Sequence, residues 1–301
     1  MRIAVLSDCR VPTIPVGGHG LGRVSVDIAL GLSARGHAVT MYAGPGSKAP
    51  DGVTLVMHAD EVTRVDALNP ADADVWLDLS HYHALTRRAE FKQAHYIMDD
   101  ECNHEPVNVI VGSAFRKRSF PTAEIVPLGI DTAAIPFDAT GGAHLLSVAK
   151  VHFNKGPDIA LEVAKRGGYD LHLYGELFGP EPEGWRGVID DNAALYRVLG
   201  AAYAFLAPYR SDAGGRVLLE AQAAGTPVLT FGDVGCISHV EHCVSGFVVQ
   251  TPDEMIEALD DVRYLKRKDA RDWVEATHSM AVMLSGLETV LTRAAEGEVW
   301  T

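Results

Sequence analysis

Short apolar runs of strand length alternate with helical patterns along the whole chain. Residues 2–7 (RIAVLS) form an apolar run, residues 22–35 (GRVSVDIALGLSAR) carry apolar side chains at helical spacing, and residues 38–44 (AVTMYAG) form the next run. Gly36 stands where the helix is expected to end, because glycine accepts the left-handed backbone of a helix C-cap. This strand-helix-strand unit predicts a parallel sheet covered by helices.

The same alternation continues to the C-terminus, interrupted by a linker-like stretch at 130–142 (IDTAAIPFDATGG). Ahead of it the expected strands are 53–58, 74–80, 94–99, 107–113 and 123–129. Beyond it they are 144–150, 169–175, 203–209, 227–231 and 246–250, with helices at 156–167, 192–200 and from about 215. We therefore predict two doubly wound α/β domains, and an apolar helix over 269–295 long enough to cross between them.

Composition supports this picture and narrows the function. The chain has 301 residues, enough for two domains, with 47% hydrophobic and 22% charged residues. A formal charge of -14 disfavours duplex nucleic acid and anionic membrane as main partners. The four cysteines show no C-x-x-C pair, and the N-terminus has neither a signal peptide nor a membrane span, so we expect a reduced, cytoplasmic protein without a metal site.

Ligands of such sheets bind beyond the carboxyl ends of the strands, so the loops there carry the candidate chemistry. The first loop, 15–24 (PVGGHGLGRV), lacks the G-x-G-x-x-G spacing, and taken alone it favours a plain tight turn over a phosphate contact. In the loop that follows 144–150, Lys150 and Lys155 are able to contact a diphosphate, or are simply solvated lysines.

The stretch 212–228 (DAGGRVLLEAQAAGTPV) places two acids around a glycine pair and a helix start. Asp212 is either an N-cap or a ligand contact. Glu220 lies inside an apolar run, where a carboxylate is costly unless it has partners. The two acids need not touch, so each is able to hold a different part of one extended ligand.

Several segments in order resemble the retaining glycosyltransferases of family 4. Residues 212–229 are similar to that family's signature of Glu, seven residues, Glu-Ala and a later Gly-x-Pro-Val, and 146–166 (LSVAKVHFNKGPDIALEVAKR) resembles its Lys-Gly-x-Asp segment. The opening strand, glycine loop and helix also fit, as do VNVIVGSAFRKR, EIVPLGID and GCISHVEHCVSGFVV.

The resemblance implies a GT-B fold, in which two Rossmann-like domains with doubly wound parallel sheets face a cleft. We expect an acceptor-side domain at 1–135 and a donor domain at 136–301, with the last helix crossing back. A nucleoside-diphosphate sugar (UDP or GDP type) is the implied donor, with no metal or other cofactor, and the acceptor is unidentified. The implied donor-binding residues are Gly17, Gly18, Lys150, Lys155, Gly214, Gly215, Arg216 and Glu220.

Two catalytic residues follow from the same resemblance. Asp212 stands where the family has Glu and would bind sugar hydroxyls, and His81 is our choice for the family's N-terminal histidine, with His83 second; the alternative is a surface-loop histidine. Lys150 in place of Arg and Arg216 in place of an apolar residue are further departures. A sugar-nucleotide epimerase and a non-catalytic nucleotide-sugar-binding protein remain as alternatives. The acidic loop at 98–106 (MDDECNHEP) is either an acceptor or cation site, or solvated surface.

Overall fold

The computed structural model describes residues 1–10, 12–14, 20–98, 106–211 and 215–300. The chain divides into two units, Met1–Gly129 together with Met280–Thr301, and Ile130–Ser279. The boundary between the units follows Gly129, earlier in the chain than the boundary expected after residue 135. The segment from Met280 onward belongs to the first unit. None of the helices in the described part of the chain combines the length and hydrophobicity that crossing a bilayer requires.

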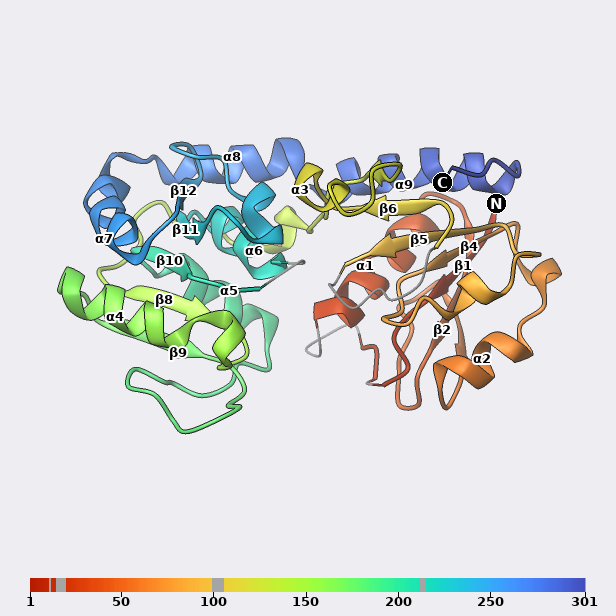
Figure 1. The fold of residues 1–301 in the computed structure, drawn as a ribbon, viewed down its shortest axis with the longest axis horizontal. Coiled ribbons are helices and arrows are strands. Elements are labelled where there is room, and N and C mark those ends of the chain that lie inside the picture. The colour runs from red at the N-terminus through yellow and green to blue at the C-terminus, as the bar shows by residue number, and fades with distance from the viewer. Residues whose placement is uncertain (11, 15–19, 99–105, 212–214, 301) are drawn as a thin grey trace. The chain divides into compact units, whose positions relative to one another are not determined.

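The first unit is built on a seven-stranded parallel sheet with the order β3-β2-β1-β4-β5-β6-β7 (Figure 1). The strands are β1 (Arg2–Leu6), β2 (Ala38–Ala43), β3 (Thr54–Met57), β4 (Val75–Asp78), β5 (Gln93–Ile97), β6 (Val109–Val111) and β7 (Glu124–Ile125). The strand order reverses between β1 and β4, so the loops that follow these two strands diverge at a topological switch point. That is where a doubly wound sheet opens for a ligand.

Four α-helices accompany this sheet in the described residues. They are α1 (Gly20–Ala34), α2 (Glu61–Ala67), α3 (Ala114–Lys117) and α9 (Met280–Ala295). On one face Trp76 of β4 is fully buried. The centre of its ring lies 5.0 Å from that of Phe91, in an edge-on arrangement, and 5.3 Å from that of Tyr42. α9 packs against α1 and against strands β4 and β5, which explains why the C-terminal segment folds with the first unit.

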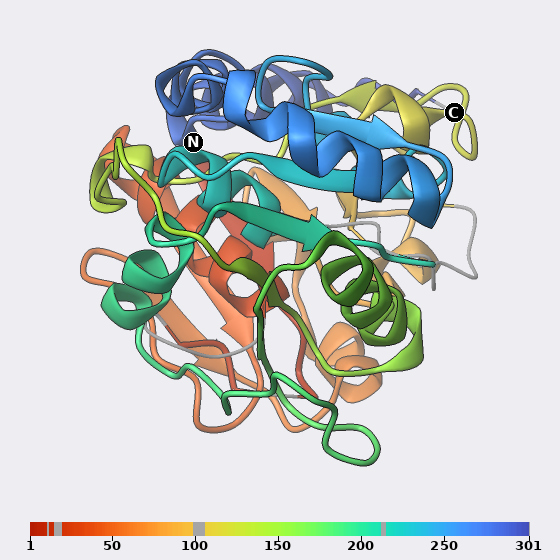
Figure 2. The ribbon, with the colours of Figure 1, turned by 90° about the vertical axis from the view of Figure 1, so that its left-hand side faces the viewer.

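The second unit has a five-stranded parallel sheet with the order β12-β11-β10-β8-β9 (Figures 1 and 2). The strands are β8 (Leu145–Val148), β9 (Leu171–Tyr174), β10 (Ala204–Ala207), β11 (Val228–Phe231) and β12 (Gly246–Val249). The helices are α4 (Pro157–Gly167), α5 (Asn192–Gly200), α6 (Arg216–Ala223), α7 (Pro252–Asp261) and α8 (Arg267–Thr277). Here the order reverses between β8 and β10, so these two strands flank the switch point.

Apolar residues of α4 and α7 cover one face of the five-stranded sheet. Ala160, Val163 and Ala164 of α4 pack with Met255 and other α7 residues against the strands, and Figure 2 shows α4, in green, in front of them. α6 contacts β10, β11, α5 and α8, so it lies on the other face. Both units therefore have the predicted α/β architecture with parallel sheets and helices, and this prediction is confirmed.

The helix expected over 269–295 is two helices, α8 and α9, and that prediction was wrong. The interruption lies at His278 and Ser279. There the carbonyl of His278 accepts a hydrogen bond of 2.9 Å from Ile130 N, and Ser279 forms a parallel bridge with Ile130. Because the His278 carbonyl accepts this bond from the linker, it is not paired with the backbone N–H four residues later, and the helix is interrupted.

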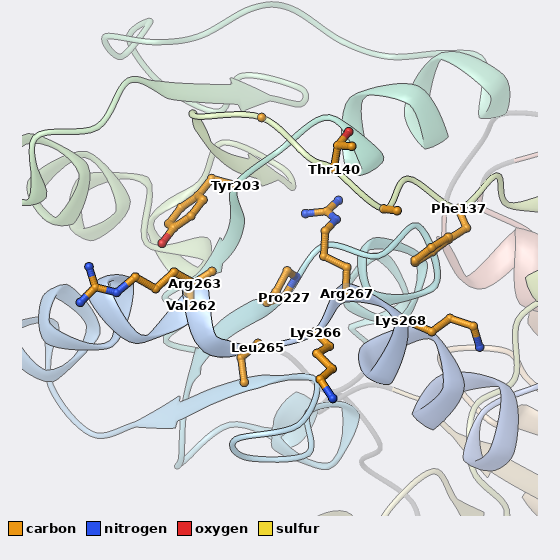
Figure 3. Close-up of a pocket in the computed structure, with 12 residues that line it drawn as sticks. Phe137, Thr140, Tyr203, Pro227, Val262, Arg263, Leu265, Lys266, Arg267 and Lys268 are labelled. Carbon is orange, nitrogen blue, oxygen red and sulfur yellow. The ribbon is translucent and has the colours of Figure 1, made fainter.

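A pocket of about 500 Å³ lies at the amino ends of the strands in the second unit. Its lining includes Tyr203, which precedes β10, and Pro227, which precedes β11, along with Arg267 of α8. Figure 3 shows the Arg267 side chain directed at the linker segment that carries Thr140. Its guanidinium donates to the carbonyls of Asp138, Gly200 and Ala202 over 2.6–3.0 Å, and to Thr226 Oγ1 over 2.8 Å.

This pocket is therefore at the edge opposite the carboxyl ends of the strands, where ligands of doubly wound sheets bind. Arg267 has a structural task there, because its donors satisfy carbonyl groups from the linker and from the end of α5. Burial lowers the pKa of Arg267 from its usual value.

We expect Arg267→Ala to lower the free energy of unfolding by about 2–4 kcal/mol, because it leaves three partly buried carbonyls without this donor. Lys268→Ala is the control, since Lys268 is an exposed neighbour that pairs with Asp272 on the helix surface, and it should change stability by about 0.5 kcal/mol or less. Urea unfolding of the three proteins measures both. Equal losses for the two variants would contradict the structural role of Arg267.

Candidate functional site

The loops that follow β8 and β10 touch at the switch point of the second unit. Arg210 N and Ser211 N both donate to the carbonyl of Asn154, at 2.8 and 3.3 Å. The carboxyl ends of parallel strands lie at the same edge of the sheet, so the loops that follow them can meet. These backbone bonds join two loops that are more than fifty residues apart in sequence.

Gly156 makes this close approach possible. Its backbone is left-handed, with a φ of 61°, and an added Cβ would lie 2.1 Å from the carbonyl oxygen of Pro208. No side chain fits there unless the two loops separate. The same residue precedes α4, whose first residue is Pro157.

An ion pair joins the loop after β10 to the first turn of α4. Arg210 donates to both carboxylate oxygens of Asp158, at 2.8 and 2.6 Å. These hydrogen bonds lower the pKa of Asp158, so the carboxylate stays ionised at neutral pH. Sequence reasoning missed this pair, because nothing in the sequence indicates that residues 158 and 210 meet.

The two predicted donor-site lysines both lie on the loop between β8 and α4. Lys150 is exposed at the end of β8, and its ammonium is 5.7 Å from the centre of the Phe178 ring. Lys155 Nζ lies 4.6 Å from the centre of the Tyr209 ring and 3.5 Å from the carbonyl of Ser211. Lys155 is thus held beside the segment that leads into α6.

α6 begins at this edge with Gly215 as its N-cap residue, at a φ of 55°. The helix N-terminus presents backbone N–H groups and a partial positive charge to an anion. Glu220 lies about one turn after the start of α6 and is fully buried. Its Oε1 accepts a hydrogen bond of 3.0 Å from Arg216 Nε. The predicted residues Gly215, Arg216 and Glu220 are therefore together; Asp212 and Gly214 lie outside the described residues.

The corresponding edge of the first unit carries His81 on the loop after β4. His81 Nε2 lies 3.4 Å from Oδ2 of Asp8, on the loop after β1, so the two loops of the switch point are paired there. Burial by itself raises the pKa of Asp8, but hydrogen bonds from Arg10 and the charges of Arg10 and His81 outweigh it and hold that pKa below its usual value. Sequence reasoning missed Asp8. The predicted Gly17 and Gly18 lie outside the described residues.

His83, the second choice for the catalytic histidine, points into the interior instead. It is 1% exposed and lies near the buried Asp78 and His95. Burial lowers the pKa of His95 to about 3, so its ring is neutral at pH 7. The acidic segment 99–105 lies outside the described residues.

A family model matches part of the second unit. Residues 186–280 match the family model described as glycosyl transferases group 1. That range includes α6 with Arg216 and Glu220, but neither Lys150 nor Lys155. A search of the curated proteins found no match.

Solved structures resemble the chain over nearly its whole length. AviGT4, a glycosyltransferase involved in avilamycin A biosynthesis, has a TM-score of 0.79 at 21% identity over 100% of this chain and 99% of its own. Sucrose-phosphate synthase from Thermosynechococcus elongatus has a TM-score of 0.78 at 17% identity, covering 99% and 100%. Anabaena Alr3699/HepE, solved with UDP-glucose, has a TM-score of 0.73 at 14% identity, covering 97% and 99%. The fold is GT-B, as predicted.

The close approach at Gly156 predicts a large effect of a small substitution. Gly168→Ala is the matched control, because Gly168 is also left-handed, at a φ of 76°, but an added Cβ there meets nothing within 4 Å. The control should lose only about 1–2 kcal/mol from backbone strain. Gly156→Ala should lose at least about 2 kcal/mol more, because the loops must separate. Similar urea midpoints for both variants would show that the Gly156 contact is unimportant.

Proposed function

We propose that this protein is a retaining glycosyltransferase that moves a sugar from a nucleoside-diphosphate sugar to an acceptor. The observation that carries the proposal is the arrangement at the switch point between β8 and β10. Two lysine-bearing positions, a helix N-terminus and a buried carboxylate come together there, and the family match covers the helix. Cations and a helix N-terminus suit a diphosphate, and a carboxylate suits sugar hydroxyls.

Each group at this edge has a distinct task in the proposed complex. Lys150 and Lys155 bind the diphosphate as point charges. Backbone N–H groups at Gly214, Gly215 and Arg216 bind phosphate oxygens at the start of α6. Glu220 accepts hydrogen bonds from the ribose hydroxyls, and its existing bond from Arg216 fixes the orientation of its carboxylate.

Following the family resemblance, we also assign roles to residues around the reacting sugar. Asp212 binds sugar hydroxyls, His81 contacts a hydroxyl near the reacting carbon, and Gly17 and Gly18 contact the donor. The pairing of His81 with Asp8 supports its role, because a carboxylate beside an imidazole orients the ring.

The proposed reaction needs no side-chain base. The bond between the anomeric carbon and the phosphate oxygen breaks, the acceptor oxygen bonds to that carbon on the same face, and the departing phosphate oxygen takes the acceptor proton. The lysines and the dipole of α6 stabilise the negative charge that develops on the leaving diphosphate, which is why we propose a metal-independent transfer.

Binding of nucleoside diphosphates tests the donor site without knowledge of the acceptor. We expect UDP, GDP or ADP to bind in calorimetry, with UDP tested first because a similar structure was solved with UDP-glucose. Lys155→Ala should weaken binding about 10- to 100-fold, since it removes a charged contact with phosphate. Lys165→Ala, at the far end of α4, should leave it unchanged. The donor assignment fails if no diphosphate binds, or if both lysine variants bind equally well.

Turnover distinguishes the proposed activity from its alternatives. With a panel of nucleotide sugars and acceptors, we expect release of the nucleoside diphosphate and a glycoside that keeps the donor's anomeric configuration, as read by NMR. Glu220→Gln should lower turnover at limiting donor, whereas Glu162→Gln, an exposed change on α4, should not. A product of unchanged mass would indicate an epimerase, and binding without turnover would indicate a non-catalytic protein.

A further inference from the structure

A buried cluster lies in the first unit, beneath the loop that carries His81. Asp78 ends β4, His95 is its direct register partner on β5, and His83 follows Asp78 by five residues. Asp78 and His95 are fully buried, and His83 is 1% exposed. The proposed transferase chemistry uses none of the three.

The three side chains converge on a common point. His95 Nδ1 lies 3.8 Å from Asp78 Oδ2, His83 Nδ1 lies 3.9 Å from Asp78 Oδ1, and one ligand atom from each residue fits within 4.8 Å of the others. Ligand atoms around a tetrahedral zinc ion lie about 3.4 Å apart, given metal-ligand distances near 2.1 Å. Small side-chain movements would therefore close the cluster around such an ion.

The hydrogen bonds of Gln93 fix the tautomer of His95. Gln93 Nε2 donates to the carbonyl of Arg88 over 3.0 Å, so its Oε1 is the acceptor that faces His95 Nε2 at 2.8 Å. His95 therefore carries its proton on Nε2, and the lone pair on Nδ1 faces the Asp78 carboxylate. This Nδ1 makes no hydrogen bond within the described residues.

The result is an electron-pair donor facing a carboxylate in the interior, with no hydrogen bond between them. Such an arrangement is unfavourable unless a proton, a water molecule or a metal ion lies between the two groups. A histidine whose other ring nitrogen donates to a carbonyl oxygen is also the usual form of a metal-ligating histidine.

The other hydrogen-bond partners of the Asp78 carboxylate are uncharged. It accepts hydrogen bonds from Ser80 N, Ser80 Oγ and, at 3.4 Å, Leu85 N. Within the described ranges, no lysine or arginine forms a salt bridge with it. The charge of the buried Arg64 acts on Asp78 from a distance, but the hydrogen bonds of Arg64 go to the carbonyl of Ser7 over 2.6 Å and to Cys9 Sγ over 3.1 Å.

We propose that Asp78, His83 and His95 form a site for a divalent transition-metal ion of the zinc type. Two imidazoles and one carboxylate are ligands that zinc accepts, and three protein ligands leave a position for a further oxygen ligand. The left-handed backbone of His83, at a φ of 43°, supports the assignment, because such conformations in non-glycine residues concentrate at functional sites.

The ion would have a structural task. It would join β5 to both ends of the segment from Asp78 to His83, and His81 lies between those ends. Binding would thus fix the loop that presents His81. The site is compatible with a sugar transfer that needs no metal, and it does not depend on that activity.

The test uses the full chain, stripped of metal with a chelator and desalted. We expect Zn²⁺ alone to bind at one ion per chain in calorimetry and to raise the unfolding temperature as its concentration rises. Co²⁺ should give visible ligand-field absorption that Zn²⁺ abolishes. Because the Co²⁺ spectrum is recorded on the unaltered chain, it does not depend on whether any variant folds.

Variants then locate the ion. Asp78→Asn and His95→Gln should each weaken Zn²⁺ binding about 100-fold or more, and Gln93→Leu about 10-fold through loss of orientation. His37→Gln is the matched control, a histidine of the same unit that pairs with Glu288 at 3.0 Å, and it should bind Zn²⁺ normally. An unaltered chain without Zn²⁺ binding and Co²⁺ absorption overturns the proposal. So does binding that Asp78→Asn leaves unchanged, because the ion would then lie elsewhere.

Discussion

The contact between the backbone of Gly156 and the carbonyl of Pro208 is the constraint on which the proposed donor site depends. In a parallel sheet, the loops on either side of the switch point run in opposite directions and leave an opening at the carboxyl edge. Here the two loops turn back far enough to touch, and the ion pair of Arg210 with Asp158 holds them. The contact places Lys155 beside the segment that enters α6. A cation and a helix N-terminus thereby reach the same edge, although neither alone specifies a diphosphate.

The two edges of the five-stranded sheet use positive charge in different ways. At the amino edge, the guanidinium of Arg267 is committed to carbonyl oxygens, so its charge stabilises the linker. At the carboxyl edge, Lys150 is exposed, and the buried acid Glu220 is bound by Arg216 rather than by a lysine. A chain with a formal charge of -14 thus still places lysines at this edge. At the carboxyl edge the exposed Lys150 is the cation most open to an anionic ligand, while the pocket at the other edge is part of the framework.

Much of the fold was predictable, because strand length, helical spacing and helix-ending glycines are local signals. The strand positions and the division into two α/β units follow from them. Contacts between distant residues were not predictable in the same way. The pairing of Asp8 with His81 depends on which strands are neighbours, and the meeting of Asp78 with His95 depends on the register of β4 and β5. The break between α8 and α9 had no local signal either, since it follows from the bond of Ile130 to His278. The motif at 212–228 indicated Glu220 because a lone acid in an apolar run is unusual.

Hydrogen exchange of the full chain with and without a saturating nucleoside diphosphate tests the central claim most directly, because it reports where the ligand binds. UDP, GDP and ADP are compared in turn. The account predicts slower exchange in two segments, from Ala149 to Gly156 and from Tyr209 to Glu220, with no change around Phe137, Tyr203 and Arg267. Protection confined to the pocket at the amino edge, with the loops after β8 and β10 unaffected by any of the three ligands, would contradict it.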